Sequence, residues 1–252
     1  MITASLPWLL LFFALAWAAS VVRRDASLAD RVWGLGFVLL AWHHAWFVTQ
    51  RGGTVDWLPV MLVTLWGLRL SAHITVRNWG HGEDRRYRAM RERNGPRWWL
   101  TSLWWVFGLQ ALLCAIIALP LGVAIPATPS SRLRIAGAAV WTLGFCWEAI
   151  ADRQLLRFVR DPASRGQVLD TGLWRYSRHP NYFGEIVCWW GVWLLAVPAG
   201  GWWTVLGPLT ITLLLVRVSG VTLLEADIAS RRPGYADYVR RTNALIPGLP
   251  RR

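Results

Sequence analysis

The chain has 252 residues, of which 55% are hydrophobic and only 16% are charged. A soluble domain of this size carries about 25% charged residues, whereas here the charges cluster and leave long apolar runs between them. These proportions exclude a secreted disulfide scaffold, a disordered chain and an ordinary soluble enzyme. They predict an all-α, polytopic integral membrane protein.

Seven apolar segments, taken in chain order, are candidates for helices that cross the ~30 Å hydrocarbon core of a bilayer. We expect the first to be a retained helix, because no basic residue precedes it as in a signal peptide. The sixth and seventh are separated only by a proline–glycine turn, so they could instead form one kinked re-entrant unit. No internal repeat or linker interrupts the chain, which predicts a single domain over residues 1–252. The segments cover approximately residues 6–22, 31–49, 55–76, 101–125, 133–152, 182–198 and 202–224.

The positive charge is carried by 27 arginines, which give a net charge of +13. Of these, 22 fall after the first, third and fifth segments and in the tail, and three fall in the opposite connections. The positive-inside rule therefore places the N-terminus outside and the C-terminus in the cytoplasm. A basic excess can also indicate nucleic acid, lipid headgroups or an anionic ligand. We expect the bacterial inner (cytoplasmic) membrane, with membrane lipids as partners and no nucleic acid.

Twenty tryptophans, several in pairs near the predicted segment ends, favour anchoring at the membrane interface. The alternative is that some line a pocket for a flat apolar substrate. Cys114, Cys146 and Cys188 lie inside apolar runs without pairing spacing, and we interpret them as small buried hydrophobes. His43 and His44 have no carboxylate or cysteine neighbour at ligand spacing. We interpret them as core or cavity lining and expect no metal site.

Charged and polar residues inside apolar segments are costly in lipid, so they tend to face a cavity or a partner. In four predicted helices they recur at helical spacing toward the cytoplasmic end. We therefore expect a polar ligand cavity that opens to the cytoplasm. The alternative is a set of ion pairs, such as Arg69 with Glu148, that only stabilise the fold. The residues are Trp66, Arg69, His73 and Arg77 in the third segment, Glu148 and Asp152 in the fifth, Asn181 and Glu185 in the sixth, and Arg217 and Glu225 in the seventh.

Many arginines together with a few carboxylates and amides match a nucleotide cofactor. Guanidinium groups bind phosphate oxygens as a fork, and carboxylates accept hydrogen bonds from ribose hydroxyls. The chain has neither a GxGxxG nor a GxxxxGK[ST] motif, so a Rossmann domain is excluded. A nucleotide site would have to be built from helix ends and side chains.

The densest cluster of chemically active residues is the stretch GLWRYSRHPNYFGE at residues 172–185. Pro180 prevents a helix from continuing through it, so Arg178 and His179 are expected to lie extended at the membrane surface. Asn181 is expected to cap the following helix, whose N-terminal dipole favours a bound anion.

This stretch, with other marks along most of the chain, resembles the C-terminal domain of the steroid 5-alpha-reductase family, in its branch of bacterial membrane homologues. The Asn-Tyr-Phe-Gly-Glu core is specific in combination with Asp152 and the Arg77-Asn78 pair. The Arg-His-Pro-x-Tyr part is less specific, because it also occurs in isoprenylcysteine carboxyl methyltransferases and related membrane methyltransferases. The further marks are Asp30, Trp33, residues 66–70, Glu83, Asp84, Arg86, Tyr87, Gln154, Leu155, Phe158, Ser219, Gly220, Glu225, Tyr235, Tyr238, Ile246 and Pro247.

The resemblance implies an NADPH-dependent reductase that transfers hydride to the β carbon of an enone in an apolar, steroid- or lipid-like substrate, while an acid polarises the carbonyl. Where the animal enzymes place a catalytic tyrosine the chain has Trp66, and Asp30 is the carboxylate nearest to their catalytic glutamate. Asp30 and His73 are therefore the candidate catalytic residues. The candidates for binding NADPH are Arg77, Asn78, Tyr87, Glu148, Asp152, Arg160, Arg165, Tyr176, Arg178, His179, Asn181, Tyr182, Glu185, Glu225, Arg240 and Arg241.

Two other classes of function are open. A membrane methyltransferase that uses S-adenosylmethionine would share the Arg-His-Pro part of the motif. Its cofactor lacks phosphates, so the surplus of arginines would be explained only by the orientation of the protein in the membrane. A transporter or lipid-binding protein would be expected to show repeats and broken helices in corresponding halves, and this sequence has none. The partner expected for a reductase is an apolar small molecule from the lipid phase. The sequence is compatible with a monomer and leaves other oligomeric states open.

Overall fold

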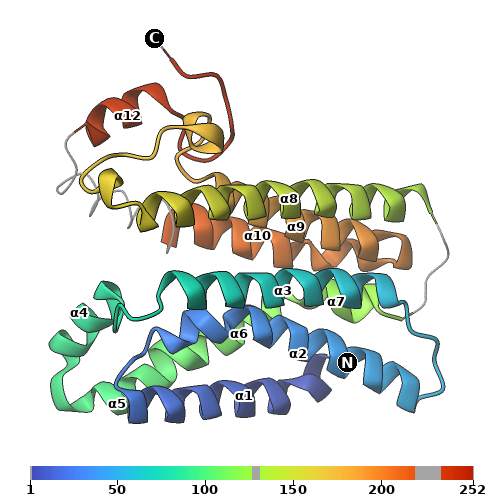
Figure 1. Cartoon of the computed structure of the whole chain (residues 1–252). Helices are drawn as coiled ribbons and strands as arrows, with labels where there is room; N and C mark the ends of the chain where they lie inside the picture. Colours follow the sequence, from blue (N-terminus) through green and yellow to red (C-terminus); the bar gives the residue numbers. More distant parts are fainter. Residues whose placement is uncertain (1, 127–130, 219–233, 252) are drawn as a thin grey trace. The chain divides into compact units, whose positions relative to one another are not determined.

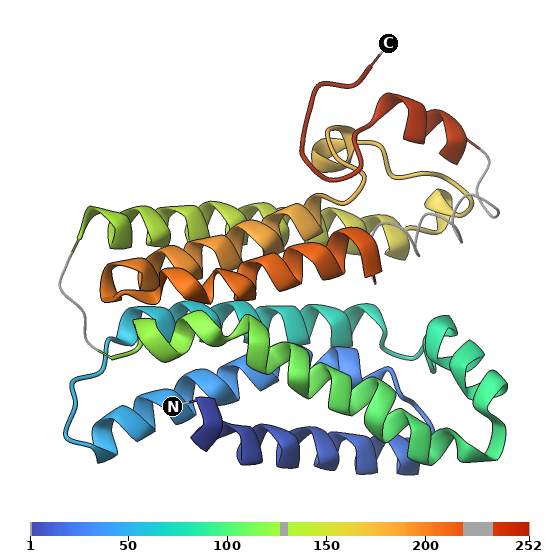
Figure 2. The same cartoon turned by 180° about the vertical axis from the view of Figure 1, so that it is seen from behind.

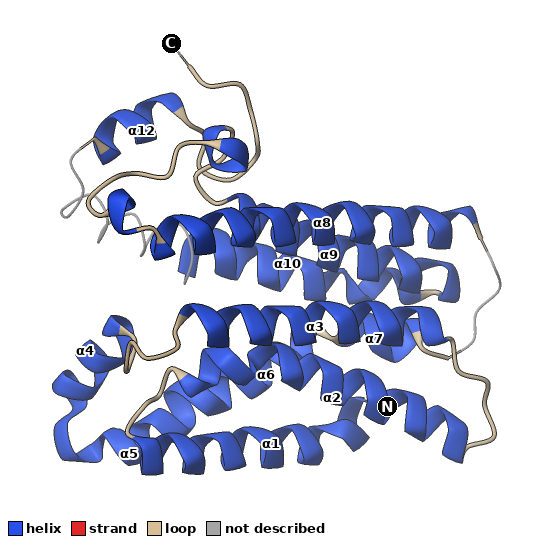
Figure 3. Cartoon of the chain, in the orientation of Figure 1, coloured by secondary structure: helices blue, strands red, loops and turns tan. Residues whose placement is uncertain are grey.

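The computed structural model describes residues 2–126, 131–218 and 234–251 (Figure 1). Six of the described helices are long and apolar enough to span a bilayer, and a shorter apolar helix covers Gly201–Arg217. The described residues form no strand beyond one isolated bridge between Val55 and Pro126 (Figure 3). The all-α, polytopic membrane architecture is therefore confirmed, while its orientation in the membrane stays a prediction. The end of the seventh predicted segment, residues 219–224, lies outside the described residues.

The helices group into two compact units. The first comprises Met1–Ser130 and Ala196–Leu206, and the second comprises Ser131–Leu195 and Gly207–Arg252. That the two units act as a single domain over residues 1–252 stays a prediction.

The first unit contains the helices from α1 to α7 and two short turns that follow α9 (Figure 1). From α4 to α6 the chain runs as one helical stretch, Arg85–Ile117, which includes a 3₁₀ turn and a π-helical turn. The elements are α1 (Ile2–Arg23), α2 (Leu28–Gln50), α3 (Trp57–Arg77), α4 (Arg85–Asn94), η1 (Gly95–Arg97), α5 (Trp98–Ser102), η2 (Leu103–Gly108), α6 (Leu109–Ile117), α7 (Leu119–Ala124), η5 (Val197–Ala199) and η6 (Gly201–Val205).

Helices α2 and α3 pack closely because each has a glycine where they meet. A Cβ atom on Gly34 would lie 2.5 Å from the carbonyl oxygen of Gly67, and one on Gly67 would lie 2.5 Å from that of Gly34. Lipid tails are as apolar as leucine, so helices in a membrane associate through this kind of close backbone packing. The loop between them ends at Asp56, whose carboxylate caps α3 by accepting a hydrogen bond from the N–H of Leu58 at 3.0 Å.

Aromatic and sulfur-containing side chains fill the contact of α2 with α1, α3 and α6. A Cβ atom on Gly36 would lie 3.1 Å from the ring of Phe13 on α1 and 3.3 Å from Sγ of Cys114 on α6. Phe37 packs edge-on against Trp66 of α3, with ring centroids 5.4 Å apart. All of these residues are buried, so α2 is the central helix of the first unit.

The second unit is built on the long helices α8 and α9 (Figure 2). A loop with two 3₁₀ turns joins them, and a short helix near the C-terminus lies against this loop. The elements are α8 (Arg132–Arg160), η3 (Pro162–Ser164), η4 (Gly172–Arg175), α9 (Pro180–Ala196), α10 (Leu206–Leu213), η7 (Leu214–Val218) and α12 (Tyr235–Arg241).

Helices α8 and α9 touch at two places, and at each place a glycine of α8 meets a glycine of α9. The two glycines of each helix are seven residues apart in the sequence. A Cβ atom on Gly144 would lie 2.7 Å from the carbonyl oxygen of Gly184, and one on Gly137 would lie 2.9 Å from that of Gly191. Seven residues make about two helical turns, so both glycines of a helix lie on the same face. The backbones of α8 and α9 are therefore in direct contact over at least two turns.

The burial of the cysteines and tryptophans agrees only in part with the expectation from the sequence. Cys114 and Cys188 are buried, and all three cysteines are free. Cys146 is exposed, so its interpretation as a buried residue was wrong. It follows Gly144 by two positions, and a helix turns by about 200° over that distance, away from α9. Both members of the tryptophan pairs 104–105 and 202–203 are exposed, whereas Trp98 and Trp189 are buried.

Candidate functional site

The candidate residues divide between the two units. Asp30, His73, Arg77, Asn78 and Tyr87 belong to the first unit, and Glu225 lies outside the described residues. The second unit carries Glu148, Asp152, Arg160, Arg165, Tyr176, Arg178, His179, Asn181, Tyr182, Glu185, Arg240 and Arg241.

Two buried carboxylic acids lie where α8 and α9 touch. Gly184 is so close to α8 that a Cβ atom on it would be 2.6 Å from the amide nitrogen of Glu148. Glu185 follows Gly184 directly, and the exposed fractions of Glu148 and Glu185 are 1% and 6%. Removing a carboxylate from water costs several kcal/mol unless charged or hydrogen-bonding groups surround it. The two acids therefore mark a polar site inside an otherwise apolar helix pair.

Asp152 adds a third buried acid one turn further along α8, with an exposed fraction of 4%. The loop that precedes α9 docks beside it. Nε1 of Trp174 donates a hydrogen bond to the carbonyl oxygen of Ala151 at 3.1 Å, and the N–H of Leu173 donates one to Oε1 of Gln154 at 3.0 Å. These two bonds hold the start of the 172–185 motif against the part of α8 that carries the acids.

An imidazole, a phenol and an amide gather at the start of α9. The helix begins at Pro180, so Asn181 lies inside the first turn, and the expectation that it caps the helix was wrong. Proline suits the first helical position because its φ is already helical and its missing N–H has no partner there anyway. The buried ring of His179 stacks on Tyr182, with centroids 5.3 Å and planes 5° apart. The carbonyl oxygen of His179 accepts a hydrogen bond from the N–H of Phe183 at 3.1 Å.

Arg178 fastens the C-terminal helix, a role that the sequence did not suggest. Its Nη1 donates hydrogen bonds to the carbonyl oxygens of Val239, at 3.1 Å, and of Thr242, at the end of α12. Its main-chain N–H donates to the carbonyl oxygen of Asn243 at 2.9 Å. One nitrogen of a guanidinium expected to bind phosphate is thus occupied by the protein itself.

The other candidate arginines of this unit lie at its surface. Arg160 and Arg165 are exposed, and their side chains make no hydrogen bond or ion pair with the part of the chain that the structure describes. Nη2 of Arg241 lies 3.6 Å from Oδ2 of Asp170. The remaining surface candidates are Tyr176 and Arg240, the latter in an ion pair with Asp237.

In the first unit, both oxygens of the Asp30 carboxylate are bound by α4. Oδ1 accepts a hydrogen bond from the hydroxyl of Tyr87 at 2.6 Å, and Oδ2 accepts one from Nη2 of Arg86 at 2.8 Å. The structure thus brings together the candidates Asp30 and Tyr87 from different helices. Tyr87 and Arg86 thus hold the Asp30 carboxylate in a fixed position against α4. The catalytic assignment of Asp30 stays a prediction.

The candidates of α3 lie toward its C-terminal end. His73 is half-buried, one helical turn before Arg77, the last residue of the helix. Nε of Arg77 donates a hydrogen bond to Oδ1 of Asn78 at 3.1 Å, and the N–H of Asn78 closes the last turn on the carbonyl oxygen of Ile74. The Arg77–Asn78 pair therefore forms the C-terminal cap of α3.

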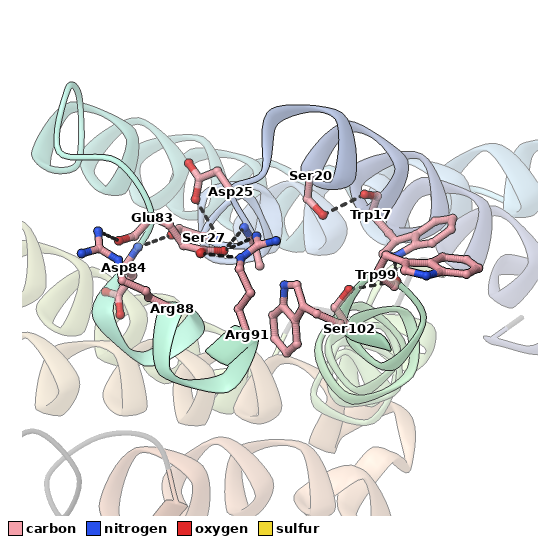
Figure 4. Close-up of polar contacts among 12 residues, drawn as sticks. Trp17, Ser20, Asp25, Ser27, Glu83, Asp84, Arg88, Arg91, Trp99 and Ser102 are labelled. Atoms are coloured by element: carbon pink, nitrogen blue, oxygen red, sulfur yellow. Dashed lines mark hydrogen bonds and ion pairs between the residues drawn. The ribbon is translucent and has the colours of Figure 1, made fainter. Parts of the chain in front are cut away.

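A second acidic centre lies at Glu83, which the sequence marked only as part of the family resemblance and not as a candidate site residue (Figure 4). Its carboxylate accepts hydrogen bonds from Nε and Nη2 of Arg91, at 2.9 and 2.8 Å, and from the N–H of Ala26 at 2.9 Å. The N–H of the next residue, Asp84, donates to Oγ of Ser27 at 2.6 Å. These bonds tie the loop after α1 to the start of α4. The charges were visible in the sequence, but their partners 57 residues away were not.

Asp84 also caps α4. Its Oδ1 accepts hydrogen bonds from the main-chain N–H and from Nε of Arg86, at 2.9 and 3.0 Å. Burial by itself would raise the pKa of Asp84, but the hydrogen bonds and the charge of Arg86, with the charge of Arg77, lower this pKa below its ordinary value overall.

The adjacent histidines of α2 face different surroundings. Nδ1 of His43 lies 2.8 Å from Oγ of Ser5 on α1, and the ring of His43 packs against Trp8 and Trp46. His44 is fully buried. Both placements agree with core or cavity lining.

Comparison with known proteins covers both units. The family described as "Protein of unknown function (DUF1295)" matches residues 16–242. An uncharacterized protein of Schizosaccharomyces pombe is 26% identical in an alignment 276 residues long, gaps included. The alignment covers 96% of this chain and 79% of the relative. No solved structure matches the chain. Because the family match extends over most of the sequence, the chain belongs to the DUF1295 family.

Proposed function

We propose that this protein is an NADPH-dependent reductase of the bacterial inner membrane. It would transfer hydride to the β carbon of an enone in an apolar, steroid- or lipid-like substrate that enters from the lipid phase. The observation that carries the proposal is that the 172–185 motif, which ends in the buried Glu185, docks against the part of α8 that carries the buried acids Glu148 and Asp152. This motif is the part of the sequence that most resembles steroid 5-alpha-reductases.

The residues of the second unit suit the parts of a dinucleotide. Buried carboxylates accept hydrogen bonds from ribose hydroxyls and from a carboxamide N–H. Phosphates need cations, and Arg160 and Arg165 are exposed, with no partner for their side chains among the described residues. The start of α9, with His179 and Tyr182, adds the positive end of a helix dipole and a flat stacked surface.

Bound NADPH would supply the hydride. Saturating a carbon–carbon double bond takes up one hydride and one proton, so the protein must also deliver a proton to the α carbon and stabilise the charge that develops on the carbonyl oxygen. Asp30 and His73 are the proposed sources of these two effects.

The first experiment identifies the nucleotide. The protein is purified in mild detergent, the nucleotide that co-purifies is identified by mass spectrometry, and melting curves are measured with NADPH, NADH and S-adenosylmethionine. We expect NADPH to raise the melting temperature most. A larger shift with S-adenosylmethionine would replace the reductase by a membrane methyltransferase, which the Arg-His-Pro-x-Tyr segment of residues 178–182 also permits.

A pair of variants tests the phosphate contacts. Replacing Arg160 and Arg165 together by Gln is expected to reduce the preference for NADPH over NADH. Arg132, exposed at the opposite end of α8, provides the matched control as Arg132→Gln. An unchanged NADPH affinity in the double variant would remove these arginines from the proposed site.

A further inference from the structure

The C-terminal segment of the second unit, residues 235–251, is fastened to the loop that leads into α9 (Figure 2). The hydroxyl of Tyr238 donates a hydrogen bond to the carbonyl oxygen of Trp174 at 2.5 Å and lies 3.3 Å from that of Ser177. The N–H of Gly248 donates to the carbonyl oxygen of Tyr176 at 3.0 Å. Segments more than 60 residues apart in sequence are thus joined side by side.

Side chains from the loop reach back to the tail in the same way. Nη1 of Arg178 donates to the carbonyl oxygens of Val239 and Thr242. The main-chain N–H of Arg178 donates to Asn243. Tyr238, Thr242 and Ser177 are all buried, so water does not compete for these bonds. The contact is a buried polar network in which donors of the loop bind acceptors of the tail and donors of the tail bind acceptors of the loop.

One hydroxyl links this network to the start of α9. Oγ of Ser177 donates to the carbonyl oxygen of Leu245 in the tail at 2.7 Å, and it accepts a hydrogen bond from the main-chain N–H of His179 at 3.1 Å. A serine hydroxyl has a single hydrogen to donate. Because this hydrogen points to the carbonyl oxygen of Leu245, the lone pairs of Oγ are left to accept the hydrogen bond from the N–H of His179. The imidazole of His179 in turn stacks on Tyr182.

We infer that residues 235–251 act as a strap that holds His179 and Tyr182 in the arrangement in which they meet the nucleotide, and that Ser177, Arg178 and Tyr238 are positioning residues of that site. The inference rests on the proposed function for the identity of the ligand. The strap itself involves only residues of the protein and can be measured without any ligand.

The experiment uses full-length protein with Tyr238→Phe, which removes one hydroxyl and keeps the ring, and with Ser177→Ala. Hydrogen–deuterium exchange is followed at the amides of residues 177–183, and NADPH affinity is measured on the same samples. Leu249→Ala is the control, because Leu249 lies in the same tail with 85% of its surface exposed.

Both variants should accelerate exchange at His179 at least threefold and weaken NADPH binding about three- to tenfold, the loss expected for one buried hydrogen bond. Leu249→Ala should behave as the wild type. Exchange unchanged in both variants would overturn the strap, and faster exchange with unaltered NADPH affinity would overturn the positioning role. If the wild type binds no NADPH, the proposed function fails, and the exchange rates alone still decide whether the tail holds the loop.

Discussion

Gly184 of α9 lies directly against Glu148 of α8. A Cβ atom on Gly184 would be 2.6 Å from the amide nitrogen and 2.7 Å from the Cβ of Glu148. This contact sets the level at which Glu148 and Glu185 are both buried. The geometry of the acidic site therefore depends on a residue that has no side chain.

Replacing Gly184 by Ala should destabilise the protein. Alanine favours a helix by about 1 kcal/mol over glycine, but the new methyl group would collide with the backbone of α8, and overpacking of this kind costs about 1–3 kcal/mol. Backbone cannot move aside as a side chain does, so the collision is expected to win. A melting curve in detergent measures the effect. Ala139→Leu, at an exposed position of α8, should leave the melting temperature unchanged. A Gly184→Ala variant as stable as the wild type would contradict the close contact.

Replacing Glu185 by Gln should weaken NADPH binding at least tenfold while the protein still folds. Glutamine keeps the shape of the side chain but loses a charge-assisted hydrogen bond, which contributes about 1.5–3 kcal/mol. Titration calorimetry beside a melting curve separates binding from stability. The same exchange at exposed Glu92 is the control. A large loss of melting temperature with full NADPH affinity would assign Glu185 to the scaffold.

Replacing Glu83 by Ala should loosen the junction between the loop after α1 and α4. The variant leaves Arg91 and the N–H of Ala26 without their acceptor, and an unsatisfied group of this kind costs about 1–3 kcal/mol. Unfolding in detergent should therefore begin at a lower temperature. Glu92→Gln, at an exposed position of α4, should have no effect on the melting temperature. Equal stability of the two variants would show that the Glu83 contacts are too solvated to contribute.

Acid should destabilise the protein in part through Asp84. The pKa of Asp84 is lower in the folded protein than in the unfolded chain, so its contribution to stability is fully present above the unfolded value of about 4 and is lost as the pH falls through the folded value. Asp84→Asn keeps a good helix cap but cannot titrate. Melting temperatures between pH 7 and pH 3 should thus fall more steeply for the wild type than for this variant. Parallel curves would show that Asp84 does not contribute to acid sensitivity.

The C-terminus should be cytoplasmic. The prediction follows from the distribution of arginines, 22 on one side against three on the other. A fluorescent protein that folds only in the cytoplasm, fused after Arg252, should be bright, and alkaline phosphatase at the same place should be inactive. The reverse result would mean that the number of membrane crossings differs by one.

The sequence determined the class of the protein and the approximate ends of α1, α2, α3 and α9. Two predicted segments were wrong at one end: α8 continues to Arg160 beyond the predicted end at 152, and the stretch Arg85–Ile117 begins well before the predicted start at 101. Apolar runs longer than the hydrocarbon core admit few structures other than helices in a bilayer, because every backbone N–H and C=O must be satisfied within the segment. The motif at residues 172–185 could be placed at a junction between loop and helix because Pro180 prevents a helix from continuing through it. The capping residue was wrong, since Pro180 and not Asn181 begins α9, and the side chain of His179, expected at the membrane surface, is buried in the protein.

The tertiary structure decided which faces of the helices meet. Hydropathy cannot specify this, because lipid and neighbouring helices are equally apolar and the choice falls to small residues that allow backbone contact. Gly144 and Gly184 bring α9 against the turn of α8 that carries Glu148, and no local pattern in the sequence pairs these two turns. Arg178 shows the same limit: its charge suggested a phosphate ligand, yet its partners are carbonyl oxygens some 60 residues away that only the folded chain brings within reach.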